Sequence, residues 1–256
     1  MLLRAALTSF RRGETLAAQP VSGPFDVSLK HLAAYNAVCG FGLRDALPLT
    51  YPHVLGFPLQ MKLMTGAGFP FPLPGLVHIA NRITQSRPLT LDEQLEITVS
   101  ARDLRPHPQG TQVDVVTSVS GVWEGVSTYL RRTGSGSSGS EELERPAGSA
   151  VWRVPADIGR RYGAVSGDRN PIHLYPVSAR LFGFKRAIAH GMWTKARCLA
   201  ALEGRLPEAV TVDVRFKKPL LIPGRVEFSA VENDGWEFGV WGKGPHLLGS
   251  AQDLTP

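Results

Sequence analysis

The residue types best suited to catalysis lie in one short stretch of the chain, residues 166–173, with the sequence SGDRNPIH. Asp168 and His173 stand five residues apart around a proline turn, so a carboxylate and an imidazole can point into one cavity and move a proton or orient a water molecule. Gly191 follows where an apolar, helix-like run begins, and its backbone N–H could there stabilise a developing oxyanion. The spacing predicts a catalytic group of Asp168, His173 and Gly191.

The residues around this group have both a functional and a purely structural interpretation. Ser166 and Asn170 can hold the turn through side-chain hydrogen bonds, and an Asx-type turn alone explains the Gly-Asp-Arg-Asn-Pro string. A lone histidine such as His173 is more often structural than catalytic, and Gly191 could simply begin an ordinary helix. His190 fits a core residue, a helix cap or a second proton donor. We take Ser166, Asn170 and His190 as candidate substrate-binding residues.

Two other kinds of site receive no support from the sequence. The histidines lack the paired spacing of zinc ligands, and the chain has no cysteine cluster. It also lacks the Gly-x-Ser-x-Gly elbow of many serine hydrolases. We therefore expect neither a metal nor a cofactor.

Charge and composition narrow the class of protein. The formal charge of +6 could attract nucleic acid, but the basic residues occur as scattered pairs without a recognisable nucleic-acid-binding signature. No apolar run is long enough to cross a bilayer, and the first seven residues are too short and broken for a secretory signal. Cys39 and Cys198 are too few for a disulfide framework, which favours reduced thiols. We expect a soluble, cytoplasmic protein that does not bind nucleic acid.

Several elements that must position the candidate residues can be recognised. Helical spacing of apolar residues from Met192 to Ala200 predicts a helix that stops near Gly204, and a matching helix is expected over Leu59–Met64, starting near Pro58. Stretches rich in β-branched and aromatic residues predict strands over Thr111–Ser120, Val122–Tyr129, Val210–Phe216, Arg225–Val231 and Trp236–Trp241. One long helix per half among several strands indicates an α+β fold, with each helix packed on an antiparallel sheet.

A glycine- and serine-rich tract over residues 134–149 divides the chain into two similar parts. Tyr35-Asn36-Ala37-Val38-Cys39-Gly40 parallels Tyr162-Gly163-Ala164-Val165-Ser166-Gly167, and further echoes follow in the same order at 87–97 and 218–228. Aligning the tyrosines places Phe41 opposite Asp168 and Ala46 opposite His173. We predict two units, 1–133 and 150–256, joined by the linker, with the catalytic pair only in the second.

Together, Tyr162–His173, Ala179, Phe182-Gly183-Phe184 and Ala189-His190-Gly191-Met192 resemble the signature of the MaoC-like dehydratases, which include the (R)-specific enoyl-CoA hydratases. The direct resemblance runs from Tyr162 to about Gly204, whereas the first half is similar to the degenerate unit of two-unit members. The resemblance implies a double hot-dog fold, in which an antiparallel sheet wraps around a long helix in each unit and the two sheets join into one.

The resemblance also implies a reaction, the reversible syn addition of water to a trans-2-enoyl thioester to give an (R)-3-hydroxyacyl thioester. The aspartate and histidine of the family correspond to Asp168 and His173, its asparagine to Asn170, and its oxyanion amide to Gly191. Many relatives carry an acidic residue two places after the histidine, where this chain has Tyr175. Residues 57–59 and 69–74, rich in phenylalanine and proline, would suit an acyl tunnel in the degenerate unit, or ordinary core and loop packing.

Several alternatives stay open. The substrate carrier is either CoA or acyl carrier protein, and both bear a phosphopantetheine that basic residues would attract. We name Lys217 and Lys218 as candidate substrate-binding residues, with Arg215 and Lys185-Arg186 as further phosphate contacts. A hot-dog thioesterase and a non-catalytic acyl-thioester-binding subunit are the competing functions. The chain could be a monomer, since one double unit mimics a hot-dog dimer, or a homodimer.

Overall fold

The computed structural model describes residues 15–133 and 150–254. The first seven residues, the tract 134–149 and thus the predicted linker lie outside the described residues, as do the outer ends of the two predicted units. Among the described residues, no helix is long and apolar enough to cross a bilayer.

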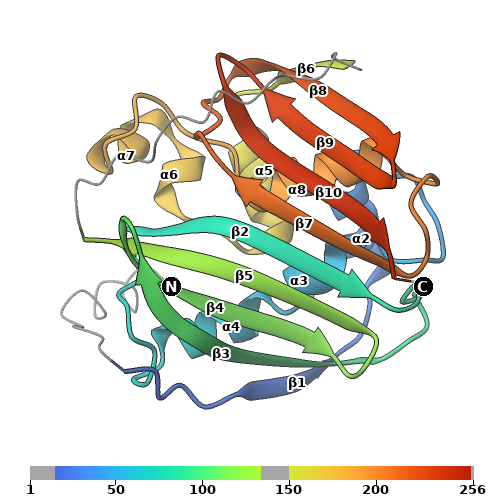
Figure 1. The fold of residues 1–256 in the computed structure, drawn as a ribbon, viewed down its shortest axis with the longest axis horizontal. Helices are drawn as coiled ribbons and strands as arrows, with labels where there is room; N and C mark the ends of the chain where they lie inside the picture. Colours follow the sequence, from blue (N-terminus) through green and yellow to red (C-terminus); the bar gives the residue numbers. More distant parts are fainter. Residues whose placement is uncertain (1–14, 134–149, 255–256) are drawn as a thin grey trace.

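One antiparallel sheet of ten strands runs through the molecule in the order β1-β3-β4-β5-β2-β7-β10-β9-β8-β6 (Figure 1). The first half of the chain contributes β1 (Val21–Phe25), β2 (Leu76–Gln85), β3 (Leu95–His107), β4 (Gly110–Val119) and β5 (Trp123–Arg132). The second half contributes β6 (Ala150–Val154), β7 (Val210–Phe216), β8 (Gly224–Asn233), β9 (Gly235–Trp241) and β10 (Pro245–Asp253). The two sets meet where β2 pairs with β7, for example at Asn81 and Val214.

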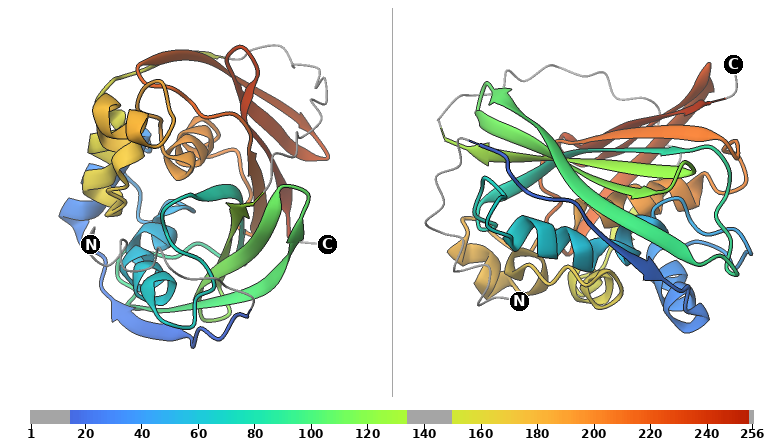
Figure 2. Two further views of the ribbon diagram at one scale, coloured as in Figure 1. Left: turned by 90° about the vertical axis from the view of Figure 1, so that its left-hand side faces the viewer. Right: turned by 90° about the horizontal axis from the view of Figure 1, so that it is seen from below.

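The helices lie on the inner side of this curved sheet (Figure 2). Those of the first half are α2 (Leu29–Cys39), α3 (Tyr51–Leu55) and α4 (Phe57–Thr65). Those of the second half are α5 (Ile158–Ser166), α6 (Pro171–Leu174), α7 (Pro176–Leu181) and α8 (Gly191–Ala201). The arrangement confirms the predicted α+β class and double hot-dog architecture, with α4 and α8 at the positions expected for the two long helices.

The strand order is symmetric about the β2–β7 pair, which is the structural form of the sequence echo. In that symmetry β1 corresponds to β6, β3 to β8, β4 to β9 and β5 to β10. The echoing tyrosines, Tyr35 and Tyr162, lie on α2 and α5, and their ring centroids are 6.3 Å apart in the core. Both helices end at a glycine in the left-handed conformation, Gly40 at φ 88° and Gly167 at φ 76°, because a side chain would strain the backbone there.

The same symmetry corrects one predicted correspondence. Ala46 forms an isolated bridge with Thr90, and the equivalent bridge in the second half joins Ile188 to Leu221. Ala46 is therefore the counterpart of Ile188 rather than of His173. The second half carries α6 and α7 as an insertion before this bridge, and His173 lies within that insertion. A constant sequence offset could not detect the change in loop length.

Candidate active site

Asp168 lies in the loop between α5 and α6, and hydrogen bonds of the loop itself determine its position. The Asp168 N–H donates to Ser166 Oγ at 3.2 Å, and the Asn170 N–H donates to Asp168 Oδ1 at 3.1 Å. Asn170 Oδ1 in turn accepts from the Ile172 N–H at 3.4 Å and so caps α6. Ser166 and Asn170, predicted to bind substrate, thus hold the loop in shape with their side-chain oxygens.

Two glycines of α5 let this loop pass close to the helix. A Cβ at position 159 would overlap the carbonyl oxygen of His173, and one at position 163 would lie 2.9 Å from the carbonyl oxygen of Asp168. In the first half, Asn36 takes the place of Gly163 and donates from its side chain to the Gly42 carbonyl. Gly159 and Gly163 therefore bring the carboxylate and the imidazole to their places.

His173 is held in one tautomer. Its Nδ1 lies 2.8 Å from the carbonyl oxygen of Ile188, which can only accept, so Nδ1 carries the proton. Burial lowers the pKa of His173 below its ordinary value, although the nearby Asp168 charge opposes this shift. At neutral pH the ring is uncharged, and its Nε2 lone pair is left to accept a proton.

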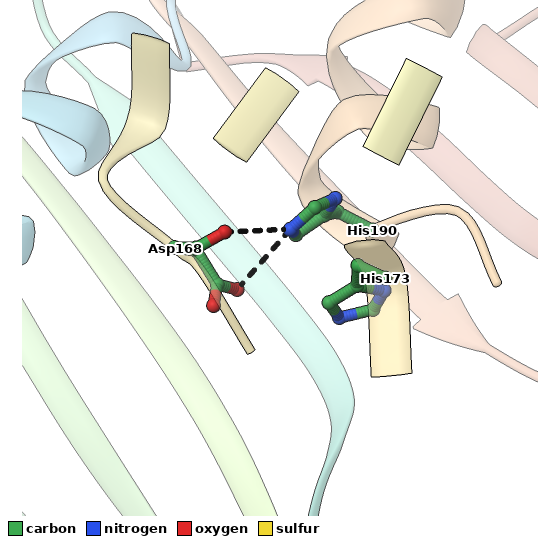
Figure 3. Close-up of side chains that lie close together, drawn as sticks. All are labelled: Asp168, His173 and His190. Atoms are coloured by element: carbon green, nitrogen blue, oxygen red, sulfur yellow. Dashed lines mark hydrogen bonds and ion pairs between the residues drawn. The ribbon is translucent and has the colours of Figure 1, made fainter. Parts of the chain in front are cut away.

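His190 packs directly on His173, with ring centroids 3.7 Å apart (Figure 3). Its Nε2–H donates to the carbonyl oxygen of Asp168 at 3.0 Å and lies 3.7 Å from Asp168 Oδ2. Burial lowers the pKa of His190 to about 3, so this ring is neutral as well. His190 therefore links Asp168 to His173, a contact that sequence reasoning did not predict.

The Asp168 carboxylate is ionised in this setting. Burial by itself raises the pKa of the carboxyl, but the adjacent His190 and His173 rings and the Asn170 N–H outweigh it, so that the pKa lies below its ordinary value. The side chain keeps 32% of its surface exposed, which leaves the carboxylate accessible to a substrate.

Gly191 is the first residue of α8, and His190 is its N-cap. The first amides of a helix have no partner within the helix and carry the positive end of its dipole. The ring of Phe216 lies against this residue, since a Cβ at position 191 would be 2.9 Å from Phe216 Cε1. Glycine is required here by the close approach of the ring.

Lys217 and Lys218 follow Phe216 on an exposed loop. Their backbone N–H groups donate to the carbonyls of His246 and Pro245. In the part of the chain that the structure describes, neither ammonium group contacts Asp168, His173 or His190. Both lysines are therefore outside the contact group of Asp168, His173 and His190.

Buried and half-buried polar residues of the first half lie near the site, and sequence reasoning missed them. Burial lowers the pKa values of His53 and His78 to about 4 and about 3, and the charge of Asp168 opposes both shifts weakly. Gln60 Nε2 on α4 donates to the His53 carbonyl and to Thr117 Oγ1, both at 3.1 Å. The only signal in the sequence was the occurrence of histidines in the half that lacks the catalytic pair.

The residues expected to line an acyl tunnel occupy mixed positions. Phe69 and Phe71 are buried in the core, whereas Phe57 and Leu59 at the start of α4 are only partly buried. The tunnel itself stays a prediction.

The site also contains a group with metal-ligand chemistry. Asp168, His173 and His190 offer one ligand atom each within 4.8 Å of one another. The two nitrogens that donate to the carbonyls of Ile188 and Asp168 are protonated and cannot also bind a metal. The expectation of a metal-free site stays a prediction.

Comparison with known proteins places this geometry in context. Residues 141–238 match the MaoC like domain family. The chain is 43% identical over 239 residues to 3-hydroxyacyl-thioester dehydratase X of Mycobacterium tuberculosis, covering 88% of this chain and 85% of that protein.

Solved structures give the same result. The crystal structure of HtdX from Mycobacterium tuberculosis superposes with a TM-score of 0.82 at 40% identity, over 92% of this chain and all of that one. A MaoC-like dehydratase from Phytophthora capsici shares the fold, with a TM-score of 0.74 at 17% identity over 94% of this chain and 97% of that one.

Proposed function

The chain belongs to the MaoC-like dehydratase family and is a hydro-lyase, and we propose that it interconverts trans-2-enoyl thioesters and (R)-3-hydroxyacyl thioesters by adding and removing water. The observation that carries this proposal is the pairing of an ionised Asp168 with a neutral His173 whose Nε2 lone pair is free, beside the first amide of α8.

The two side chains have complementary roles toward water. In hydration, the Asp168 carboxylate accepts a hydrogen bond from one O–H of the water and so orients the molecule. His173 Nε2 takes the other proton of the water as the oxygen forms its bond to C3. The imidazolium then returns this proton to C2, so that one water adds across the double bond. Since the polar atoms of Asp168 and His173 lie within 4.8 Å of each other, one water can contact both, and its oxygen and proton then reach the same face of the substrate.

Gly191 supplies the electrophilic part of the reaction. Attack at C3 moves negative charge onto the thioester oxygen, and an N–H at a helix N-terminus stabilises that charge. The partial positive charge of the α8 dipole acts in the same direction. Dehydration uses the same groups in reverse.

The substrate is an acyl group bound as a thioester to CoA or to acyl carrier protein. In this proposal Lys217 and Lys218 bind the phosphate of the phosphopantetheine, and what supports it is that both are exposed and directly follow Phe216, whose ring packs on Gly191. In this scheme Ser166, Asn170 and His190 also hold Asp168 and His173 in position, and their direct contact with substrate stays a prediction.

Spectrophotometric hydration of crotonyl-CoA and of longer enoyl-CoAs tests the proposal. We expect loss of the enoyl absorbance without release of free thiol, and the same rate after dialysis against a chelator. Release of CoA thiol would establish a thioesterase instead, and absence of both signals with intact thioester binding would establish a non-catalytic binding subunit. Loss of activity on chelation, restored by one added metal, would overturn the metal-free mechanism.

A further inference from the structure

Exposed apolar side chains gather on α7. Val177 and Leu181 are 72% and 82% exposed, and the flanking Tyr175 and Phe182 are 55% and 49% exposed. These four residues, which we name the α7 face, are four of the ten large apolar side chains that the described residues expose. Single exposed apolar residues are ordinary, but a cluster of this kind marks an interaction site.

The α7 face is held in place rather than left loose. Val177 and Leu181 stand four residues apart and so point to the same side of the helix, whereas Ala179 is buried beneath it. The Ser178 hydroxyl donates to the carbonyls of Pro171 and Tyr175, which ties α7 to α6. The outward apolar side is thus a preformed surface.

The segment of the chain that carries the α7 face is strongly basic. Between Ile158 and His190 the only acidic residue is Asp168, which belongs to the active site. The same segment carries six exposed cations, namely Arg160, Arg161, Arg169, Arg180, Lys185 and Arg186. The guanidinium of Arg160 lies 5.4 Å over the ring of Tyr175, so positive charge directly borders the apolar face. A surface of this chemistry fits a partner that is acidic and partly apolar.

The position of the face ties that partner to catalysis. α6 carries His173, and α7 follows it from Pro176 on the outer side of the molecule (Figure 1). A second copy of the chain is a poorer occupant, since a two-fold contact would bring the same cations face to face.

We propose that the α7 face is the docking surface for an acidic acyl carrier protein that delivers the acyl group as its thioester. This proposal rests on the proposed function. It implies that the preferred substrate is the thioester of the carrier protein rather than that of CoA. The apolar side chains contribute contact area with the carrier, and the surrounding cations attract it and fix its orientation.

The test compares one acyl group on two carriers. Turnover is measured with crotonyl-CoA and with an acidic acyl carrier protein loaded with crotonyl-phosphopantetheine, for the wild type, Val177→Ser/Leu181→Ser and Arg180→Glu. Leu43→Ser, which changes an equally exposed leucine in the first half, and Arg225→Glu on β8 are matched controls. Calorimetric titration with the unloaded phosphopantetheinylated carrier measures docking without catalysis.

We expect the serine double variant to raise KM for the carrier-linked substrate by about tenfold or more, to leave turnover of crotonyl-CoA unchanged, and to weaken carrier binding equally. Arg180→Glu should weaken carrier binding further at low salt, and both controls should behave as wild type. Equal effects on the two substrates, or none on carrier binding, would overturn the docking proposal.

Two further outcomes would also overturn it. One is a serine variant that loses binding to anionic phospholipid vesicles while it keeps carrier binding, and the other is a variant that changes only the oligomeric state. If the wild type hydrates neither substrate but still binds the carrier through this face, the proposed reaction fails and the docking proposal stands.

Discussion

Two hydrogen bonds to carbonyl oxygens determine the chemistry of the histidines at the site. Because Ile188 accepts from His173 Nδ1, the free nitrogen of that ring is a base, and because Asp168 accepts from His190 Nε2, the second ring is fixed against the first. The backbone thus selects the tautomers, and the neighbouring carboxylate is left to orient water.

Substitution of either Asp168 or His173 should abolish most of the activity. We expect Asp168→Asn and His173→Ala each to lower turnover of crotonyl-CoA by about 10²–10⁴-fold, as is typical for general acid–base groups. Steady-state kinetics measures the loss, and circular dichroism checks that the fold is intact. Retention of wild-type turnover by either variant would refute the assigned roles.

The pH dependence of catalysis should follow the neutral form of His173. Since burial lowers its pKa below 6.5, the midpoint of the acid-side decline of kcat/KM should lie below pH 6.5. Asp168 raises the pKa of His173, so the residual activity of Asp168→Asn should decline at a still lower pH. A decline centred above pH 6.5 in the wild type would contradict the assignment of His173 as the base.

At the scale of elements, strands rich in β-branched residues could be predicted from the sequence. Strands that carry polar side chains into the interior could not. The predicted strand Thr111–Ser120 corresponds to β4, and Val210–Phe216 is β7 as predicted, because both segments are rich in β-branched residues and their valines are buried. β2 lies at the centre of the sheet but was not predicted, because His78 and Asn81 interrupt its apolar pattern. α5 was missed because its glycines serve close approach rather than helix stability.

The candidate site shows the same limit. Asp168, His173 and Gly191 could be predicted from one local motif, and the structure gathers Asp168 and His173 and sets Gly191 at a helix start. His53, His78 and Phe216 come from distant segments whose proximity depends on strand pairing across the two halves. No local spacing encodes such contacts.

The close passage of the catalytic loop over α5 can be tested with one methyl group. Gly159→Ala should displace the loop, since its Cβ would overlap the His173 carbonyl, and should cost about 1–3 kcal/mol of stability together with most of the turnover. Gly23→Ala on β1, where a Cβ meets nothing within 4 Å, is the matched control. Urea unfolding and crotonyl-CoA kinetics measure both effects, and a fully active Gly159→Ala would contradict the packing argument.

Lys195 anchors α8 to the two central strands. It is fully buried, and its Nζ donates to the Asn81 carbonyl, Asn81 Oδ1 and the Val212 carbonyl at 3.0, 2.7 and 3.1 Å. Lys195→Met keeps most of the volume but leaves these acceptors unpaired, so we expect a loss of roughly 1–3 kcal/mol or more. Lys62→Met on α4, an exposed position, should change the free energy of unfolding little. Equal stability of the two variants would show that the buried bonds contribute nothing.

At the scale of the whole molecule, the buried histidines make folding sensitive to acid. His53, His78 and His190 have pKa values of about 4, about 3 and about 3, against 6.5 for an ordinary histidine. Above pH 6.5 both folded and unfolded chains hold them neutral, and below it only the unfolded chain takes up protons. The free energy of unfolding should therefore fall by about 1.4 kcal/mol per pH unit for each histidine as the pH drops below 6.5.

Urea unfolding between pH 7.5 and 5 measures this slope. His53→Gln should reduce this slope by one proton, because one of the three rings named above is then missing. A slope of zero below pH 6.5 would show that the three rings are protonated in the folded chain.

The pairing of β2 with β7 determines how activity depends on protein concentration. Separate single units would have to associate through these strands, and their activity would fall with concentration. Because both strands belong to one polypeptide, the seam forms within the molecule, at an effective concentration set by the connecting chain rather than by the abundance of the protein. The half that carries Asp168 and His173 therefore keeps its polar neighbours His53 and His78 however few copies of the enzyme are present.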